Sequence, residues 1–293
     1  MDILLIILEQ VCIHIPLLCG TYISFSLMKV PDLSIESAYV TGALLGSKMV
    51  LVCAPYGVIV QAIGAVVGGM LGGILVGFTS SMLTHLVRMP HLLSTIITFG
   101  LFYGINQYIS GIYITLNTTV NPLVIPLSSR YPELVALLFF GVAVYGLLWY
   151  LLQTQLGYAW AVYGLNQNFF KHYGIQKHVV FISGITVSNA LAGLSGYLFA
   201  QSNGFAEINM AFGKVLLCIT ALILGKALMG HRKPMTSLLP ITGGFAYFAL
   251  QQLLLRVGFN LRYFSTIQAL VVLAVLLSLR GMHVESETDH LGV

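Results

Sequence analysis

Nine stretches of about twenty mostly apolar residues run through this chain, and they constrain its fold more than any other feature. Only 8% of the 293 residues are charged, whereas a soluble domain carries about 25% charged residues. An α-helix needs a run of this length to cross the hydrocarbon core of a bilayer. The sequence therefore predicts an all-α integral membrane protein, one polytopic domain over residues 1–293. The predicted spans are 3–28, 38–54, 57–81, 92–109, 134–153, 179–202, 212–229, 238–256 and 265–280.

Basic residues predict the orientation of the helices, because cytoplasmic loops carry an excess of Lys and Arg. If the loop 154–178 is cytoplasmic, seven basic residues lie inside and four lie outside. Those inside are Lys29, Arg88, Lys171, Lys177, Arg232, Lys233 and Arg280, and those outside are Arg130, Lys214, Arg256 and Arg262. The N-terminus then faces out and the acidic C-terminal tail faces in. Asp2 and Glu9 stand where a secretory signal would carry positive charge, so we expect the first span to be a retained helix.

An odd number of crossings separates the first four predicted helices from the last four. The two parts, 1–110 and 179–280, are therefore expected to be inverted copies. Asp32–Ser34 resembles Glu207–Asn209, since each has an acid, an aliphatic residue and a small polar residue before an apolar helix. Inverted repeats place interrupted helices around a central path in transporters, so these segments are our first candidates for its lining. The alternative is that both are interfacial loops whose acid caps the next helix.

Two further polar residues lie within predicted spans and join the candidate path, Lys48 in the second span and Asn189 in the sixth. A charge at membrane depth costs several kcal/mol unless it faces protein or water. We therefore expect Lys48 to face the bundle interior or a wet cavity, where it would contact an anionic group of a solute. The alternative is a lysine that extends to the membrane interface beside a locally short helix.

The third span carries two ladders of glycines spaced four residues apart. One ladder is Gly64, Gly68 and Gly72, and the other is Gly69, Gly73 and Gly77. This spacing lets helices approach backbone to backbone, so the ladders predict helix packing, with a dimer face as a special case. They do not form a nucleotide-binding fingerprint, because no strand precedes them.

The sequence predicts neither a catalytic site nor a metal site. Cys12, Cys19, Cys53 and Cys218 lie in apolar stretches without the paired spacing of metal ligands or disulfides, which favours a packing role. His85 and His91 flank a predicted cytoplasmic turn, where they add positive charge or contact lipid phosphates, with a metal site as the alternative. The chain has no Gly-Lys-Ser/Thr phosphate loop, so it does not use ATP by itself. No basic cluster is dense enough for nucleic acid.

The loop 154–178 is the one long stretch that cannot cross a bilayer. Ala159, Val162, Tyr163, Asn166, Phe170 and Tyr173 lie three or four residues apart, on one face of an amphipathic helix. Gly157 precedes the segment and Gly174 follows it, as residues that end short helices do. A cytoplasmic amphipathic helix, in a chain with no energy-coupling motif, predicts a partner that supplies the energy.

Three stretches carry a resemblance to a known family: 24–46, 89–111 and 156–213. They are similar to ATP-binding-cassette (ABC) importer permeases of the branched-chain amino acid and ribose type, and within these to permeases assigned to tryptophan/tyrosine-like uptake. The resemblance implies a cytoplasmic coupling helix from Gly157 to Gly174. Its matching or candidate residues are Gly157, Tyr163, Gly164, Asn166, Phe170 and Gly174. The chain departs from the family at Trp160 and Val162, where an arginine is usual, and at Lys226, where an acid is usual.

The resemblance also implies the partners and the mechanism. Two permease copies would form a central path in the bacterial cytoplasmic (inner) membrane, surrounded by lipid. Each coupling helix would seat in an ATP-binding subunit that holds the ATP and magnesium. An extracytoplasmic substrate-binding protein would dock on the outer loops 110–132 and 257–264, with Arg130, Arg256 and Arg262 pairing with its acids. The expected cargo is a small polar solute such as an amino acid. An ion-coupled secondary transporter and a membrane-embedded enzyme are the alternatives.

Overall fold

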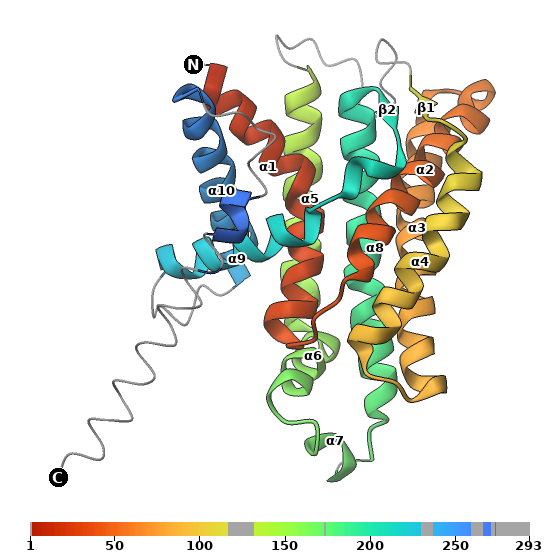
Figure 1. Ribbon diagram of the computed structural model, residues 1–293, viewed down its shortest axis with the longest axis vertical. Helices are drawn as coiled ribbons and strands as arrows, with labels where there is room; N and C mark the ends of the chain where they lie inside the picture. The colour runs from red at the N-terminus through yellow and green to blue at the C-terminus, as the bar shows by residue number, and fades with distance from the viewer. Residues whose placement is uncertain are drawn as a thin grey trace, which may run out of the picture.

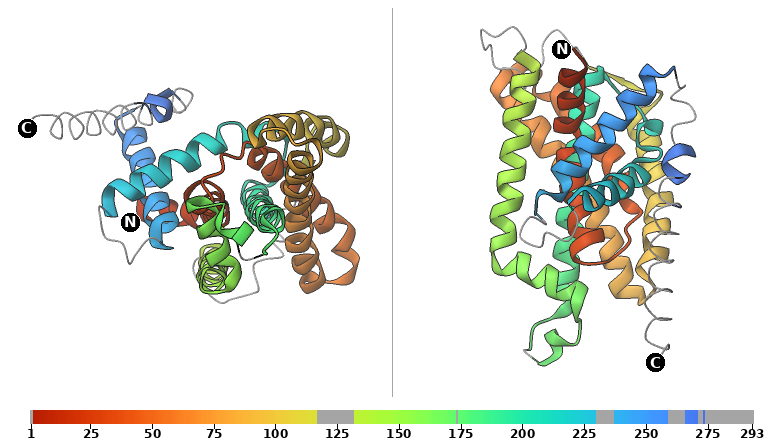
Figure 2. Two further views of the ribbon diagram at one scale, coloured as in Figure 1. Left: turned by 90° about the horizontal axis from the view of Figure 1, so that it is seen from below. Right: turned by 90° about the vertical axis from the view of Figure 1, so that its left-hand side faces the viewer.

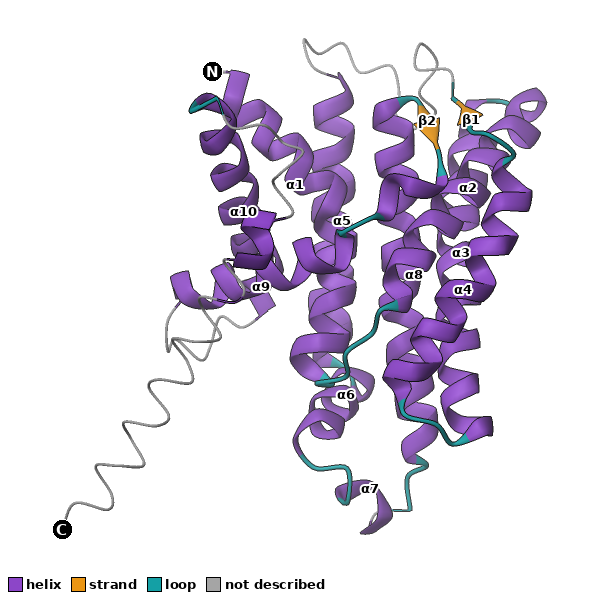
Figure 3. Ribbon diagram, in the orientation of Figure 1, coloured by secondary structure: helices purple, strands orange, loops and turns teal. Residues whose placement is uncertain are grey.

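The computed structural model describes residues 2–116, 132–172, 174–229, 237–258, 266–270 and 273 of the chain. Nearly all of these residues are helical, as Figures 1 and 3 show. In chain order the elements are α1 (Asp2–Thr21), the π-helix η1 (Tyr22–Leu27), α2 (Ser34–Cys53), the 3₁₀ helix η2 (Ala54–Tyr56), α3 (Val58–Val87), α4 (His91–Ser110), β1 (Ile114–Thr115), α5 (Pro132–Gln153), α6 (Gln155–Leu165), α7 (Phe169–His172), α8 (Lys177–Asn203), β2 (Phe205–Ala206), the 3₁₀ helix η3 (Ile208–Ala211), α9 (Lys214–Met229) and α10 (Leu239–Arg256).

Seven helices in the described part of the chain are long and apolar enough to cross a membrane, and each matches a predicted span. They are Ile3–Leu27, Ser34–Tyr56, Val58–Val87, His91–Ser110, Leu134–Gln153, Lys177–Asn203 and Ile208–Met229. The predicted span 238–256 forms α10, which has 18 residues and is not among the seven. The span 265–280 lies largely outside the described residues. The all-α polytopic fold is confirmed, and the total of nine helices stays a prediction.

The helices form an elongated bundle with two different ends. In Figure 1, α6 and α7 lie at the lower end, together with the turn between α3 and α4. The N-terminus lies at the opposite end, where β1 and β2 pair antiparallel through Ile114 and Ala206. This arrangement agrees with the predicted orientation, which puts the N-terminus and the loop 154–178 on opposite sides.

Two helices begin inside the bundle, between its two ends, rather than at a membrane surface. These are α2 and α9, as Figure 1 shows. The loop before α2 follows η1 and turns through Lys29, whose φ of 55° is unusual for a residue with a side chain. The sequence predicted interruptions at Asp32–Ser34 and Glu207–Asn209. Helix α2 starts at Ser34, in the first of these segments, and α9 starts at Lys214, shortly after the second. The inverted-repeat relation between 1–110 and 179–280 nevertheless stays a prediction, because part of the second half lies outside the described residues.

The two glycine ladders of α3 pack against two different helices of the same chain. Gly64, Gly68 and Gly72 face α2, whereas Gly69, Gly73 and Gly77 face α8. A Cβ atom added to Gly72 would overlap the backbone of Gly42, and one added to Gly73 would overlap the carbonyl of Asn189. The helices therefore touch backbone to backbone, as in other small-residue membrane contacts. Both ladders therefore make their helix contacts within the chain.

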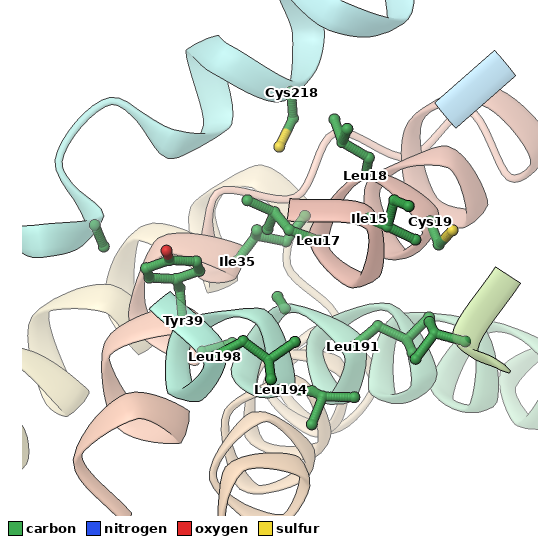
Figure 4. Packing of buried hydrophobic residues seen from close by; sticks show 14 of the residues in the cluster. Ile15, Leu17, Leu18, Cys19, Ile35, Tyr39, Leu191, Leu194, Leu198 and Cys218 are labelled. Atoms are coloured by element: carbon green, nitrogen blue, oxygen red, sulfur yellow. The ribbon is translucent and has the colours of Figure 1, made fainter. Parts of the chain in front are cut away.

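The apolar core lies where α1, α2, α8 and α9 meet. Figure 4 shows side chains from these four helices packed together, with Leu17 and Leu18 of α1 near Cys218 of α9, and Tyr39 of α2 near Leu198 of α8. The outer helices are much less buried, and only 17% of the span window in α5 is buried inside the chain. Exposed apolar side chains on a spanning helix face lipid or another membrane protein. Figure 2 shows α3 and α5 at the outside of the bundle.

Candidate translocation and coupling sites

Asp32, Ser34 and Asn189, three of the predicted path residues, meet inside the bundle. The side-chain amide of Asn189 donates to Oδ2 of Asp32 at 2.7 Å. The backbone N–H and the hydroxyl of Ser34 both donate to Oδ1 of Asp32, at 2.8 and 2.5 Å. All three residues are 0% exposed. Asp32 therefore caps the start of α2, as the alternative interpretation predicted, and also ties α2 to α8.

Close helix packing positions this cluster. Asn189 lies on α8 opposite Gly73 and Gly77, and a side chain at either glycine would overlap the Asn189 region. The amide nitrogen of Asn189 also donates to the carbonyl of Ile185 at 2.9 Å, which fixes its orientation. The approach of α2 to α8 is equally close, since a Cβ atom added to Gly42 of α2 would overlap the backbone of Gly193 on α8. This close packing of α8 brings its amide within reach of the acid at the start of α2.

The polar cluster continues into the turn between α3 and α4. Nε2 of His91 lies 4.0 Å from Oδ1 of Asp32, and Nδ1 of His91 lies 2.9 Å from the hydroxyl of Thr84. Thr84 is in turn 2.5 Å from the hydroxyl of Ser94. The structure brings no group of three or more potential metal-ligating side chains together in the described part of the chain. His85 instead stacks on the ring of His178.

The remaining predicted path residues do not join Asp32. Lys48 is exposed near the C-terminal end of α2, on the outside of this chain rather than in its interior. Glu207 is partly buried and precedes η3 without a capping hydrogen bond. Asn209 is exposed on η3. The cap of α9 is a different acid, because Oε1 of Glu36 accepts the backbone N–H of Val215 at 3.2 Å.

A pocket with a cavity volume of about 80 Å³ lies between α2, α4 and η3. Asn209 lines this pocket, together with a mixture of polar and aromatic side chains. The lining residues are Glu36, Ser37, Val40, Phe99, Tyr103, Asn106, Ile208, Asn209, Ala211 and Phe212. Asn209 is thus a predicted path residue that borders this pocket.

The predicted single coupling helix from Gly157 to Gly174 is wrong in one respect, because the segment forms two helices. Asn166 ends α6 in an extended conformation, with φ −154° and ψ 95°. Its side-chain oxygen accepts the backbone N–H of Asn168 at 3.0 Å. Asparagine makes such local turns readily and so interrupts helices. Phe170 then lies in the short helix α7, and Gly174 follows it with φ 67°.

The inward face of α6 includes Ala159, Val162 and Tyr163 of the predicted stripe and also Trp160, which the stripe left out. Trp160 is fully buried, and its indole N–H donates to the hydroxyl of Ser183 on α8 at 3.1 Å. Gly157 is buried against the end of α5. Gly164 touches the carbonyl of Leu27 so closely that no side chain would fit there. A hydrophobic residue at Trp160 had looked like a departure from the family, but it anchors α6 to the bundle.

Part of the predicted stripe does pack inward, through aromatic side chains. Phe170 is 1% exposed and lies 6.3 Å from the ring of Tyr163, which also contacts Phe181. Burial raises the pKa of the Tyr163 phenol above its usual value, so this ring stays neutral at physiological pH. Tyr173 and the side chains of Lys171 and His172 lie outside the described residues.

One predicted outer-loop lysine lies inside the bundle instead. Lys214 begins α9, and its ammonium is 3.0 Å from Nε2 of His14 and 4.3 Å from the ring centre of Phe199. The hydropathy pattern could not reveal this, because a lysine at the edge of an apolar run resembles a loop residue. Of the predicted receptor contacts, Arg256 is exposed at the end of α10, and Arg130 and Arg262 lie outside the described residues.

The chain is a polytopic helical bundle in which α2 and α9 begin between its two ends, with a buried polar cluster at the start of α2 and two short helices at one end. This is the architecture of a transport permease. The chain belongs to the family described as the branched-chain amino acid transport system / permease component, which matches residues 4–276. It is the permease component of an ABC importer.

Two relatives named as permeases support this assignment. The chain is 28% identical to a tyrosine transport system permease protein of Clostridioides difficile, over 88% of this chain and 84% of that protein. It is also 28% identical to an uncharacterized protein of Rickettsia prowazekii, over 89% and 91% of the two chains. An autoinducer 2 import system permease protein of Escherichia coli is 26% identical over 51% of this chain and 44% of its own length. No solved structure matches the chain.

Proposed function

We propose that α6 and α7 form the surface on which a separate ATP-binding subunit docks, and that movement of this surface changes the solute path beside α2. The ATP-binding subunit binds and hydrolyses the ATP. The chain would act in a bacterial cytoplasmic membrane as a multi-pass subunit, in keeping with the bacterial relatives. An extracytoplasmic substrate-binding protein would deliver the solute to the end of the bundle that carries the N-terminus.

The contact between α6 and the loop before α2 carries this proposal. Gly164 of α6 touches the carbonyl of Leu27, and Trp160 lies against Gly184, which also touches Met28. Leu27 and Met28 lead within a few residues to Asp32, which caps α2. A push on α6 therefore acts directly on the loop that sets the position of α2. Packed helices transmit such displacements because their interfaces deform little.

The buried cluster of Asp32, Ser34 and Asn189 is proposed as a closing point of the path. All of its polar atoms are paired across α2 and α8, with no exposure to solvent. A path that opens here must break the bond between Asn189 and Asp32. A buried charged hydrogen bond of this kind holds a closed state and is costly to separate without water.

We propose two copies of the chain for the complete path. The pocket beside Asn209 opens at the surface of one chain, next to α4, whose span window is only 28% buried. Gly100 and Gly104 on α4 have open space around them, four residues apart. Small residues at this spacing favour close contact with another membrane helix. A second copy packed there would complete the wall of the pocket.

The proposed cargo is a small polar solute, and an amino acid is the first choice. Support comes from the family description and from the relative named as a tyrosine permease. The relative named for autoinducer 2 import covers only half of the chain, so it weighs less. L-tyrosine is therefore the first solute to test.

Reconstitution tests the proposal. The chain would be placed in proteoliposomes with the ATP-binding subunit and the receptor encoded beside it, with ATP inside and labelled L-tyrosine outside. We expect uptake that needs both ATP and the receptor and is insensitive to proton and sodium ionophores. Gly164→Ala should lower the uptake per ATP hydrolysed, whereas Gly146→Ala, on an open helix surface, should not. Uptake by the chain alone that ionophores abolish would contradict the proposal.

A further inference from the structure

The pocket between α2, α4 and η3 has a composition that the permease function alone does not explain. It combines one carboxylate, Glu36, with two side-chain amides, Asn106 and Asn209, and three aromatic rings. The open surface of the pocket is mainly apolar, with a smaller polar part. Ionisable side chains within a membrane bundle are costly, and they are typically functional.

The carboxylate of Glu36 is held in place at the wall of the pocket. The backbone N–H of Val215, in the first turn of α9, donates to Oε1 of Glu36 at 3.2 Å. The N-terminus of a helix stabilises a negative charge. Because Glu36 sits on α2 and Val215 sits at the start of α9, the two helices that begin inside the bundle meet at this side chain.

The other walls suit a cation with an apolar body. Phe99 and Tyr103 come from α4, and Phe212 follows η3, so aromatic rings border the cavity from two sides. An ammonium group near such rings gains cation–π attraction in addition to the attraction of a carboxylate. Asn106 is 2% exposed and is held by the hydroxyl of Thr41 at 3.0 Å, so its amide has a fixed place in the wall.

We propose that this pocket is a binding subsite for the ammonium group of a primary amine with an aromatic or apolar body. The inference rests on the proposed function, because the amine would be part of the solute that the permease carries. The cavity of about 80 Å³ fits the head of such a solute rather than the whole molecule. The rest of the solute lies toward the open side, beside the exposed rings of Tyr103 and Phe212.

A thiol at the pocket tests the charge of the site without any transport. Asn209→Cys places a thiol on the exposed η3 wall, and Asn203→Cys places a matched thiol at the exposed end of α8, outside the pocket. Each variant would be treated with two methanethiosulfonates of opposite charge, the trimethylammonium and the sulfonate reagent, in membranes that hold the full chain. The unsubstituted chain gives the background of the four native cysteines.

The ratio of the two reaction rates is the measured quantity. We expect the cationic reagent to be favoured about tenfold more at N209C than at N203C, as one nearby carboxylate in a partly wet site would cause. Adding Glu36→Gln should remove this preference while leaving N203C unchanged, because glutamine keeps an oxygen for the Val215 N–H. In chains that keep Glu36, an equal ratio of the two rates at N209C and N203C would overturn the proposal. This outcome does not depend on whether the glutamine variant folds.

Protection by a soluble amine is the second readout. Tyramine should slow the modification of N209C when Glu36 is present, and should not slow it when N209C is combined with E36Q. The compound 3-(4-hydroxyphenyl)propionate, which lacks the ammonium group, should not protect N209C. Equal protection by both compounds, or none by tyramine, would overturn the assignment of an ammonium site. Neither readout needs the ATP-binding subunit, so a failure of ATP-driven uptake and a failure of this subsite are distinguishable.

Discussion

The bond between Asp32 and Asn189 yields the sharpest energetic prediction. Its two atoms are 2.7 Å apart and both residues are 0% exposed. Asn189→Asp would bring two carboxylates together in a site without water, and removing the partner of a buried charge costs about 3–5 kcal/mol. Asp32→Asn removes the charge but keeps an acceptor for Ser34, so we expect a loss of about 1–2 kcal/mol.

The double variant Asp32→Asn/Asn189→Asp exchanges donor and acceptor. It restores one amide and one carboxylate at the same distance, so we expect it to recover about 2 kcal/mol relative to N189D alone, within the range for coupled neighbours. In a chain of this size, one kcal/mol corresponds to roughly 2–4 °C in Tm. N189D should therefore lower the apparent Tm by about 10 °C, and the exchange should recover about half of this loss.

The native cysteines provide the assay. Cys12, Cys19 and Cys218 are buried, so a dye that becomes fluorescent on reacting with thiols reports unfolding of the purified chain in detergent. All variants would be compared at one heating rate, because membrane proteins often unfold irreversibly. A double variant no more stable than N189D would refute the direct pairing, and an N189D variant as stable as the native chain would refute the burial of the pair.

Three further predictions follow from the packing. Gly73→Val should prevent accumulation of folded chain, because the new side chain overlaps the backbone of α8, whereas Gly146→Val at an open position should express normally; equal expression would contradict the packing. Trp160→Ala should lower the free energy of unfolding by about 3–5 kcal/mol, and Trp160→Phe by less, and each loss would appear as a lower Tm. An unchanged Tm in the alanine variant would be the contrary result. Lys214→Met should leave the Tm unchanged or raise it, since the described residues show no acid paired with Lys214 and burying a charge is costly; a large drop would show that its contact with His14 stabilises the fold.

The sequence was sufficient for seven membrane spans in the described part of the chain and for naming Asp32, Ser34 and Asn189, but not for the contacts among these three residues. Long apolar runs require helices in a bilayer, because no other local structure satisfies every backbone group there. Asp32 and Ser34 were found because they resemble Glu207–Asn209 in the proposed inverted repeat, and the helix start that they form was the alternative interpretation. Asn189 was found as a polar residue inside a span, but nothing in the sequence indicated that it pairs with Asp32. That pairing depends on how closely Gly42 and Gly193 let α2 approach α8.

Other features depend on tertiary contacts that periodicity does not encode. Lys48 lies within a predicted span and Lys214 at the edge of one, yet Lys48 is exposed and Lys214 packs against His14. The predicted face of α6 packs inward, but Trp160 was not placed on it, because its contacts are with residues that are distant in sequence, such as Ser183. Glu36 lies within an apolar helix, and its role as the cap of α9 arises only when α9 starts beside it. Hydropathy could not have found it.

Labelling of a single exposed position on α6–α7 tests the central claim most directly, namely that this surface faces the cytoplasm and receives the ATP-binding subunit. Gln167 is exposed between the two helices, so Gln167→Cys offers a thiol there. A membrane-impermeant maleimide should label Q167C in inverted vesicles and not in intact cells, and the bound ATP-binding subunit should block the labelling. Labelling from the outside of intact cells, or labelling that the bound subunit leaves unchanged, would contradict the account.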